Sequence, residues 1–291
     1  MSALEFLLAG TLAAALPLLL AALGEMVVEK TGLLNLGLEG MMALGAAIAF
    51  ICVYHSGSHS FGFLAASLAG ATLAMLFAFL VIFLKANEVA SGLAVGVLGL
   101  GLSALFGKNY ESLTISGLSE FGLPAFSKIP VIGPALFTQD IVVWLAITGT
   151  MVLWYILNKT KLGLIIAAVG ENAEAARAIG YPVGAIRCAA VAFGGGMCGL
   201  AGAYASTVYT PLWADGMIAG RGWIALALVV FGTWQTGRVA FGAVLFGVLS
   251  LGELTAQAIG VAIPSQVLSS LPYFVTILML VAISRHRRHS S

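Results

Sequence analysis

Polar side chains set among long apolar runs are the residues of this chain that could do chemistry. Carboxylates, amides and guanidinium groups supply directed hydrogen bonds, and indole rings stack on flat molecules, so together they suit the recognition of a small polar solute. Such groups are costly to bury in apolar surroundings, so each needs a reason to be there. The residues that we expect to line a solute path are Asn35, Glu39, Asn87, Trp213, Asp215, Arg221, Trp223 and Glu253.

Several of these residues also have a purely structural interpretation. Asn35 and Glu39 are four residues apart, so we expect them to share one helical face, where they either line a path or pack helices together. Asn87 stands where an N-cap for the following helix belongs, and Trp213 with Trp223 fits an aromatic belt at a membrane interface. The sequence leaves these alternatives open.

Motifs for catalysis or metal binding are missing from the sequence. The segment most similar to a phosphate-binding loop runs from Gly101 to Lys108. Its glycines are one residue too far apart, and Asn109 stands where Ser or Thr is needed. There is no HExxH zinc motif and no GxSxG nucleophile elbow. His55 and His59 lie in a Ser- and Gly-rich turn that favours a solvated loop over a metal site. We therefore expect no enzyme activity, no metal and no cofactor.

Composition places the chain in a lipid bilayer. Of its 291 residues, 60% are hydrophobic and 9% are charged, and the mean hydropathy is +1.06. Apolar runs of roughly 17 to 25 residues form helices in hydrocarbon because every backbone amide needs an internal partner. We predict an all-α, polytopic integral membrane helical bundle that forms a single transmembrane domain over residues 1–291. A net charge of +1 without a long internal basic stretch argues against nucleic acid as a partner.

Hydropathy predicts about nine membrane spans, and eight or ten are also compatible with the pattern. The segment 222–234 is too short to cross the bilayer upright and the next run is rich in glycine, so one or both could be re-entrant or broken helices. Glycines four residues apart, Gly92 with Gly96 and Gly195 with Gly199, predict close helix packing. The predicted spans are 4–23, 38–54, 61–84, 88–106, 141–157, 188–208, 222–234, 239–256 and 271–284.

The distribution of positive charge orients the bundle. If the loop of about 158–187 is cytoplasmic and the spans alternate, ten of the 13 Lys and Arg residues fall on the cytoplasmic side and three outside. This arrangement predicts an external N-terminus, a cytoplasmic C-terminus and a long external loop over about 107–140. The ten are Lys30, Lys85, Lys159, Lys161, Arg177, Arg187, Arg238, Arg285, Arg287 and Arg288, and the three are Lys108, Lys128 and Arg221.

A compact polar helix of about two turns is predicted inside that cytoplasmic loop. Asn172 is positioned to cap it, Glu174 lies near the positive end of the helix dipole, and Gly180 followed by Pro182 ends it. Its alanines would let another protein surface approach closely, and we expect a soluble motor protein to push there. The residues predicted for this contact are Gly170, Glu171, Asn172, Glu174, Ala175, Ala176, Arg177 and Gly180.

Three stretches give the chain a family resemblance. They are Gly32-Leu-Leu-Asn-Leu-Gly-Leu-Glu-Gly-Met-Met-Ala-Leu-Gly45, the loop from Gly170 to Pro182, and the segment from Tyr209 to Gly232. The chain resembles permease subunits of bacterial ATP-binding-cassette (ABC) importers in the branched-chain amino acid and simple sugar superfamily, and most of all the nucleoside-type permeases. It departs from the family at Thr236-Gly237-Arg238, where a proline is often found.

The resemblance implies a set of partners and a place in the cell. Two ATP-binding subunits, or one duplicated ATPase, would dock on the coupling loop at 170–182. A second permease, a different sister chain, would complete the path, and an external solute-binding protein would deliver the small-molecule solute. The expected location is the bacterial inner (plasma) membrane.

These observations predict a permease subunit of an ATP-driven importer. The expected solutes are nucleosides first, then pentose-like sugars, then flavins or other purine-like heterocycles, with branched-chain amino acids last. Titratable residues deep in the spans would mark a proton or sodium relay, and no such relay is obvious, which fits an ATP motor. The main alternative is a secondary carrier or a channel, and an integral membrane enzyme is a third possibility.

Overall fold

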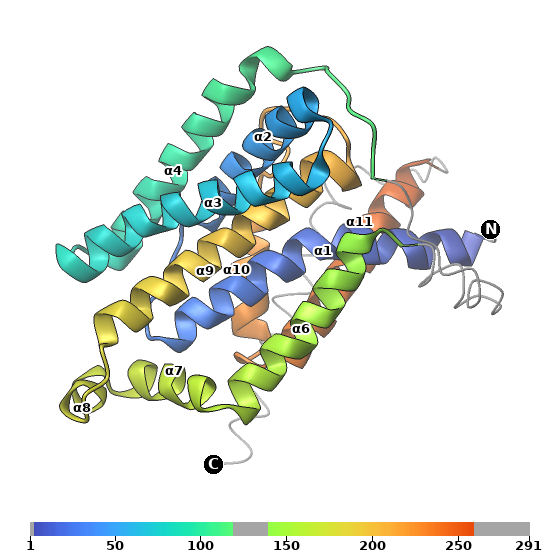
Figure 1. The fold of residues 1–291 in the computed structure, drawn as a ribbon. Helices are drawn as coiled ribbons and strands as arrows, with labels where there is room; N and C mark the ends of the chain where they lie inside the picture. Colours follow the sequence, from blue (N-terminus) through green and yellow to red (C-terminus); the bar gives the residue numbers. More distant parts are fainter. Residues whose placement is uncertain (1–2, 119–138, 259–291) are drawn as a thin grey trace.

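Helices dominate the described part of the protein. The computed structural model describes residues 3–118 and 139–258 (Figure 1). Within those two ranges the backbone forms no regular strand, and an isolated antiparallel bridge joins Thr114 to Leu212. The predicted all-α class is therefore confirmed.

Six helices in the described ranges are long and apolar enough to cross a membrane. π-Helical turns extend two of them, η1 (Phe79–Phe83) after α3 and η3 (Ala205–Tyr209) after α9, and a 3-10 turn, η2 (Lys108–Tyr110), follows α4. The first helix continues past the predicted end at residue 23, so that Glu25 and Glu29 lie inside it. The six are α1 (Ala3–Lys30), α2 (Leu38–Ser56), α3 (His59–Ala78), α4 (Glu88–Gly107), α6 (Ile141–Lys159) and α9 (Val183–Tyr204).

Helix α9 lies at the centre of the packing, with α1, α2 and α3 against it (Figure 1). Glycine makes the close approach possible, because a Cβ at Gly195 would lie 2.5 Å from the carbonyl oxygen of Gly70 in α3. A Cβ at Gly45 in α2 would likewise lie 2.6 Å from the Cα of Gly199. The predicted packing role of Gly195 and Gly199 is confirmed.

The other predicted glycine pair holds α4 against the beginning of α2. A Cβ at Gly92 would lie 2.7 Å from the backbone nitrogen of Leu36, and one at Gly96 would lie 3.3 Å from the Cα of Gly37. Both glycines therefore serve backbone contact, which places α4 beside residues 36–40.

The seventh predicted span is a short helix that begins inside the bundle. Helix α10 (Arg221–Phe231) has 11 residues, about 16 Å at 1.5 Å per residue, against a hydrocarbon core of about 30 Å. The non-helical segment 210–220 precedes it and ends at Gly220, which is hydrogen-bonded to Glu39 in the first turn of α2. The short length of α10 agrees with the prediction of a broken or re-entrant helix, which stays a prediction.

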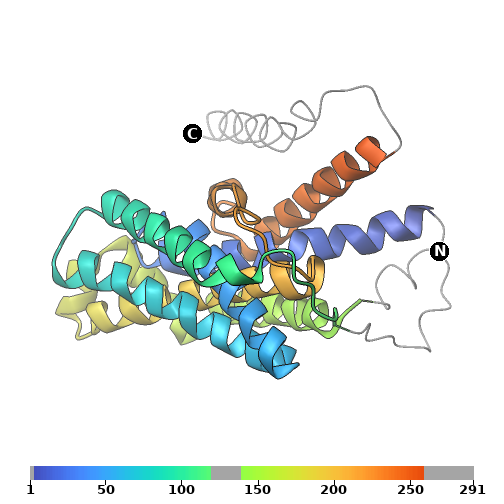
Figure 2. The ribbon, with the colours of Figure 1, turned by 90° about the horizontal axis from the view of Figure 1, so that it is seen from above.

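Helix α11 (Thr236–Ala258) is continuous, so its glycines do not break it. They serve packing instead, because a Cβ at Gly247 would lie 2.5 Å from the carbonyl oxygen of Thr11 in α1. Figure 2 shows α11 beside α1 and away from α3 and α4. The predicted span 271–284 and residues 119–138 of the predicted external loop lie outside the described residues.

Most of the positively charged side chains of the described ranges gather at one end of the bundle, which we name the α8 end. It holds the C-terminal ends of α1 and α6, the beginnings of α2, α4 and α9, and two short helices, α7 (Lys161–Glu171) and α8 (Ala173–Ala178) (Figure 1). This grouping agrees with the predicted order of loops, and the side of the membrane that the α8 end faces stays a prediction. The residues there are Lys30, Lys85, Lys159, Lys161, Arg177, Arg187 and Arg238, whereas Lys108 lies at the opposite end.

Candidate functional site

The polar helix predicted in the loop of about 158–187 is present as α8, six residues long. The Oδ1 atom of Asn172 accepts hydrogen bonds from the backbone N–H groups of Glu174 (3.1 Å) and Ala175 (2.9 Å), so the predicted cap is confirmed. Gly180 has a φ of +95°, which favours glycine, and it lies where the chain leaves the helix. Helix α7, which the sequence interpretation did not predict, leads into α8.

One face of α8 is anchored on the protein and the other is exposed. Ala176 is 2% exposed and packs against Val169 of α7 and Val183 of α9. Arg177 is exposed, and so is Ile179, at 72%. Ala176 therefore holds α8 in place, which corrects the expectation that it would face a partner. The other predicted contact residues Glu171, Asn172, Glu174, Ala175 and Gly180 are exposed.

Helix α7 presses on the loop that joins α1 to α2. A Cβ at Gly170 would overlap the carbonyl oxygen of Lys30, so the two backbones are in contact. Arg187 in α9 donates a hydrogen bond from Nε to the carbonyl oxygen of Thr31 over 3.1 Å. Gly32, with a φ of +80°, turns the chain beside Gly170. Residues 30–32 are therefore in direct contact with α7 and α9.

Two acidic side chains also hold the loop that joins α1 to α2. Glu25 Oε1 accepts a hydrogen bond from the backbone N–H of Asn35 over 2.9 Å, and Glu88 Oε2 accepts one from that of Leu34 over 3.0 Å. Glu25 and Asn35 are each 1% exposed. Because a buried carboxyl group is costly unless it is hydrogen-bonded, Glu25 fixes the course of this loop.

Asn35 and Glu39 do not share a helical face, so that prediction is wrong. Asn35 Oδ1 accepts a hydrogen bond from the backbone N–H of Gly37 over 2.9 Å. This local bond competes with helix formation, and α2 begins only at Leu38. Glu39 lies in the first turn of α2, where its Oε1 accepts a hydrogen bond from the backbone N–H of Gly220 over 3.1 Å.

A pocket of about 270 Å³ lies beside Glu39, and we name it the Glu39 pocket. Residues of α2, α4 and the segment 213–219 line it, including Ser103 and Asp215. Glu39 Oε2 is buried and has no hydrogen-bond partner among the described residues. Trp213 is 2% exposed, and its ring lies against Gly107. A carboxylate oxygen and an indole ring beside one cavity are groups that a small hydroxylated molecule can bind.

Among the other predicted path residues, Asn35, Asn87, Arg221 and Trp223 do not line this pocket. Asn87 caps α4 by accepting a backbone hydrogen bond over 3.0 Å. Trp223 is 49% exposed on α10, and the Arg221 guanidinium lies 5.6 Å from the ring centroid of Tyr209. The side chain of Glu253 lies outside the described residues. Over residues 3–118 and 139–258, no three His, Cys, Asp or Glu side chains gather as metal ligands would.

A hydrogen bond between α1 and the turn that joins α10 to α11 was not predicted. Trp234 donates from Nε1 to Glu29 Oε2 over 2.6 Å. The turn is sharp, because Thr233 and Trp234 have φ values of +48° and +56°. The sequence signal for this pair was weak, since Glu29 beside Lys30 is equally typical of a headgroup region. Only the fold brings Glu29 to Trp234, 205 positions away.

The chain matches a known protein family over nearly its whole length. A family model described as "Branched-chain amino acid transport system / permease component" matches residues 7–284. A protein of Haloferax volcanii named as a putative glucose ABC transporter permease is 39% identical over 94% of this chain and 90% of its own length. The nucleoside ABC transporter permease protein NupC of Lactococcus lactis is 32% identical, over 95% of this chain and 92% of the relative. The guanosine ABC transporter permease protein NupQ of Bacillus subtilis is also 32% identical, over 95% and 91%. No solved structure matches the chain.

Proposed function

The chain belongs to the family of permease components of branched-chain amino acid transport systems, and on this premise we propose that it is the membrane-embedded subunit of an ATP-driven importer. The relatives named above are ABC transporter permeases and support this proposal. The chain would supply the path through the bilayer and leave ATP hydrolysis to partner subunits. The resemblance stated from its sequence was therefore to the right family.

The proposed solute carries a hydroxylated sugar ring. The relatives are named for glucose, nucleosides and guanosine, and such a ring is common to all three. In the Glu39 pocket, Glu39 Oε2 would accept hydrogen bonds from ring hydroxyls while Trp213 packs against the ring. The proposed solute is therefore either a nucleoside, as the sequence predicted, or a hexose.

The exposed face of α8, backed by the contact of Gly170 with Lys30, is the observation that carries the proposed coupling. An ATPase dimer docked on α8 would push α7 onto residues 30–32. Because Glu25 and Glu88 hold the following loop, the push would reach the beginning of α2, where Glu39 faces the pocket. Movement of α7, residues 30–32 and the beginning of α2 between two positions would open the path alternately to the two sides of the membrane.

The proposed orientation places the α8 end in the cytoplasm. The N-terminus would then lie outside and the C-terminus inside, in the inner membrane of a bacterium. Two ATP-binding subunits, or one duplicated ATPase, would dock from the cytoplasm, and an external solute-binding protein would deliver the solute. A sister permease would complete the path. A secondary carrier or channel is not favoured, because the named relatives are ABC transporter permeases.

Reconstituting the chain with its ATPase, sister permease and solute-binding protein tests the proposal. Proteoliposomes should take up labelled guanosine or glucose only with ATP present. Arg177→Glu should lower uptake by about tenfold, the effect of ~1.4 kcal/mol of interface energy. Lys108→Glu makes the same charge change at the opposite end of the bundle and should leave uptake unchanged. Uptake by the chain alone, or uptake that follows an ion gradient, would contradict the proposal.

A further inference from the structure

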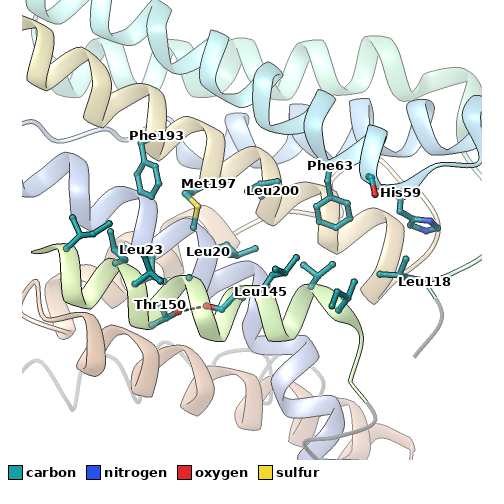
Figure 3. A pocket seen from close by; sticks show the side chains of 18 residues that line it. Leu20, Leu23, His59, Phe63, Leu118, Leu145, Thr150, Phe193, Met197 and Leu200 are labelled. Carbon is teal, nitrogen blue, oxygen red and sulfur yellow. Dashed lines mark hydrogen bonds between the residues drawn. The ribbon is translucent and has the colours of Figure 1, made fainter. Parts of the chain in front are cut away.

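A second cavity, of about 530 Å³, lies between α6 and the layer formed by α1, α3 and α9 (Figure 3). This volume is within the usual range of ligand pockets. Phe193 and Met197 of α9 face it from one side, and Leu145 and Thr150 of α6 from the other (Figure 3). The cavity is distinct from the Glu39 pocket, with which it shares no lining residue.

The lining of this cavity suits hydrocarbon and does not suit a sugar or a nucleoside. The hydroxyl of Thr150 already donates to the carbonyl oxygen of Ala146 in its own helix over 2.7 Å. His59 and Ser60 are the other polar side chains of the lining, and both lie at one end, where α3 begins. A hydroxylated solute would lose its hydration here without replacement hydrogen bonds. The occupant is therefore apolar over most of its length.

The cavity runs along most of α6, one of the six helices that are long and apolar enough to cross a membrane. Its lining on α6 runs from Ile141 to Ile156, about 22 Å at 1.5 Å per residue. The cavity is therefore longer than the hydrocarbon layer of one leaflet, which is about 15 Å thick. Leu145 and Val152 are 63% and 53% exposed, so the cavity opens on the surface that lipid covers. Acyl chains of the bilayer are the adjacent apolar material that can make dispersion contacts with this lining.

One end of the cavity offers the chemistry of a headgroup site. His59 Nε2 is buried and has no hydrogen-bond partner among the described residues. His59 is the first residue of α3, which Ser58 caps by accepting a hydrogen bond from the backbone N–H of Phe61 over 3.4 Å. A phosphate or glycerol ester beside His59 would give His59 Nε2 a hydrogen-bond partner while its acyl chain runs along α6.

We propose that this cavity binds a phospholipid, with one acyl chain between α6 and α9 and the headgroup at His59. The lipid supports α6, whose C-terminal end leads through Thr160 into α7. The proposal depends on the membrane location of the chain and not on the identity of its solute.

Photolabelling of the purified full-length chain in detergent tests this proposal. The probe is a phosphatidylglycerol with a diazirine in its acyl chain, added at low molar ratio and washed before irradiation. Mass spectrometry should find adducts on lining residues of α6 and α9. Gly149→Leu fills the cavity and should lower these adducts about tenfold. Gly101→Leu is the matched control, since a Cβ at either glycine meets nothing within 4 Å and Gly101 does not line the cavity.

Other outcomes of the same experiment are equally decisive. Similar labelling of the Gly149→Leu and Gly101→Leu proteins would overturn the proposal, as would adducts spread evenly over exposed residues of α4 such as Val97. Labelling that disappears when the sister permease binds would identify a subunit interface instead and would also overturn it. Leu145→Trp fills the cavity from another position if Gly149→Leu folds poorly. His59→Phe should reduce labelling too, and full labelling of that variant would overturn the headgroup assignment.

Discussion

The carbonyl oxygen of Lys30 occupies the space that a side chain at Gly170 would need, so the end of α1 and the end of α7 touch through their backbones. Helix α7 leads into the exposed α8, and α1 leads into the loop that Glu25 and Glu88 hold. Two segments about 140 positions apart in sequence thus form one unit at the α8 end. The first prediction concerns this contact.

Gly170→Ala should uncouple ATP hydrolysis from uptake. Overpacking at a close contact costs about 1–3 kcal/mol, and here the added methyl group pushes α7 away from residue Lys30. We expect uptake in proteoliposomes to fall about tenfold while the ATPase still copurifies with the permease. Gly184→Ala is the control, because the nearest atom to its Cβ would be Ile82 Cγ2 at 3.9 Å. Equal uptake by the two variants would show that the Gly170 contact does not transmit force.

Trp234→Phe should destabilise the protein by removing the donor to Glu29. Glu29 Oε1 already lacks a partner among the described residues, and the substitution leaves Oε2 without its 2.6 Å hydrogen bond. The free energy of unfolding should fall by ~1 kcal/mol. This is at the low end for an unpaired buried group, because Trp234 is 38% exposed. The midpoint of thermal unfolding in detergent measures it.

A double substitution separates this hydrogen bond from simple loss of ring packing. Glu29→Met combined with Trp234→Phe removes both polar partners, so stability should return toward that of the unmodified chain. Trp154→Phe, at an exposed position of α6, should change little. If the double variant is less stable than Trp234→Phe alone, then the bond to Glu29 is not the source of the effect.

The spans were predictable because bilayer hydrocarbon imposes one solution on an apolar run, a helix that satisfies its own backbone. The same constraint made α10 recognisable as incomplete. The cap at Asn172 and the turn at Gly180 were also predictable, because both depend on neighbours within a few residues. Local chemistry thus accounts for the helices and for the shape of α8.

Features that depend on distant segments were missed or misplaced. Asn35 looked helical with Glu39, but its bond to Gly37 and the bond from Glu25 hold it in a loop. Ala176 looked like its neighbouring alanines until the fold set it against Val169. Helical spacing alone does not reveal which face of a helix the rest of the chain covers, so inward and outward residues of α8 were not distinguishable.

Gly195→Val should destabilise the bundle more than the same change at Gly101. A Cβ at Gly195 would press on the Gly70 backbone in the central packing of α9 against α3, whereas one at Gly101 would meet open space. Backbone cannot yield as a flexible side chain does, so we expect a loss of about 1–3 kcal/mol or misfolding. Yield of folded protein and thermal unfolding of both variants measure the difference. Similar stabilities would mean that α3 and α9 pack less closely than the geometry indicates.

Glu39→Gln should weaken solute binding while leaving the fold intact. The amide oxygen of glutamine can still accept the hydrogen bond from Gly220, so the beginning of α10 stays in place. The negative charge beside the pocket is lost, and hydrogen bonds to a charged group exceed neutral ones by about 1 kcal/mol or more. The KM for uptake should therefore rise about fivefold or more, with unchanged thermal unfolding. Glu111→Gln, at an exposed position beyond η2, is the control. An unchanged KM in folded Glu39→Gln protein would mean that the solute does not meet this carboxylate, and the path would then have to run elsewhere.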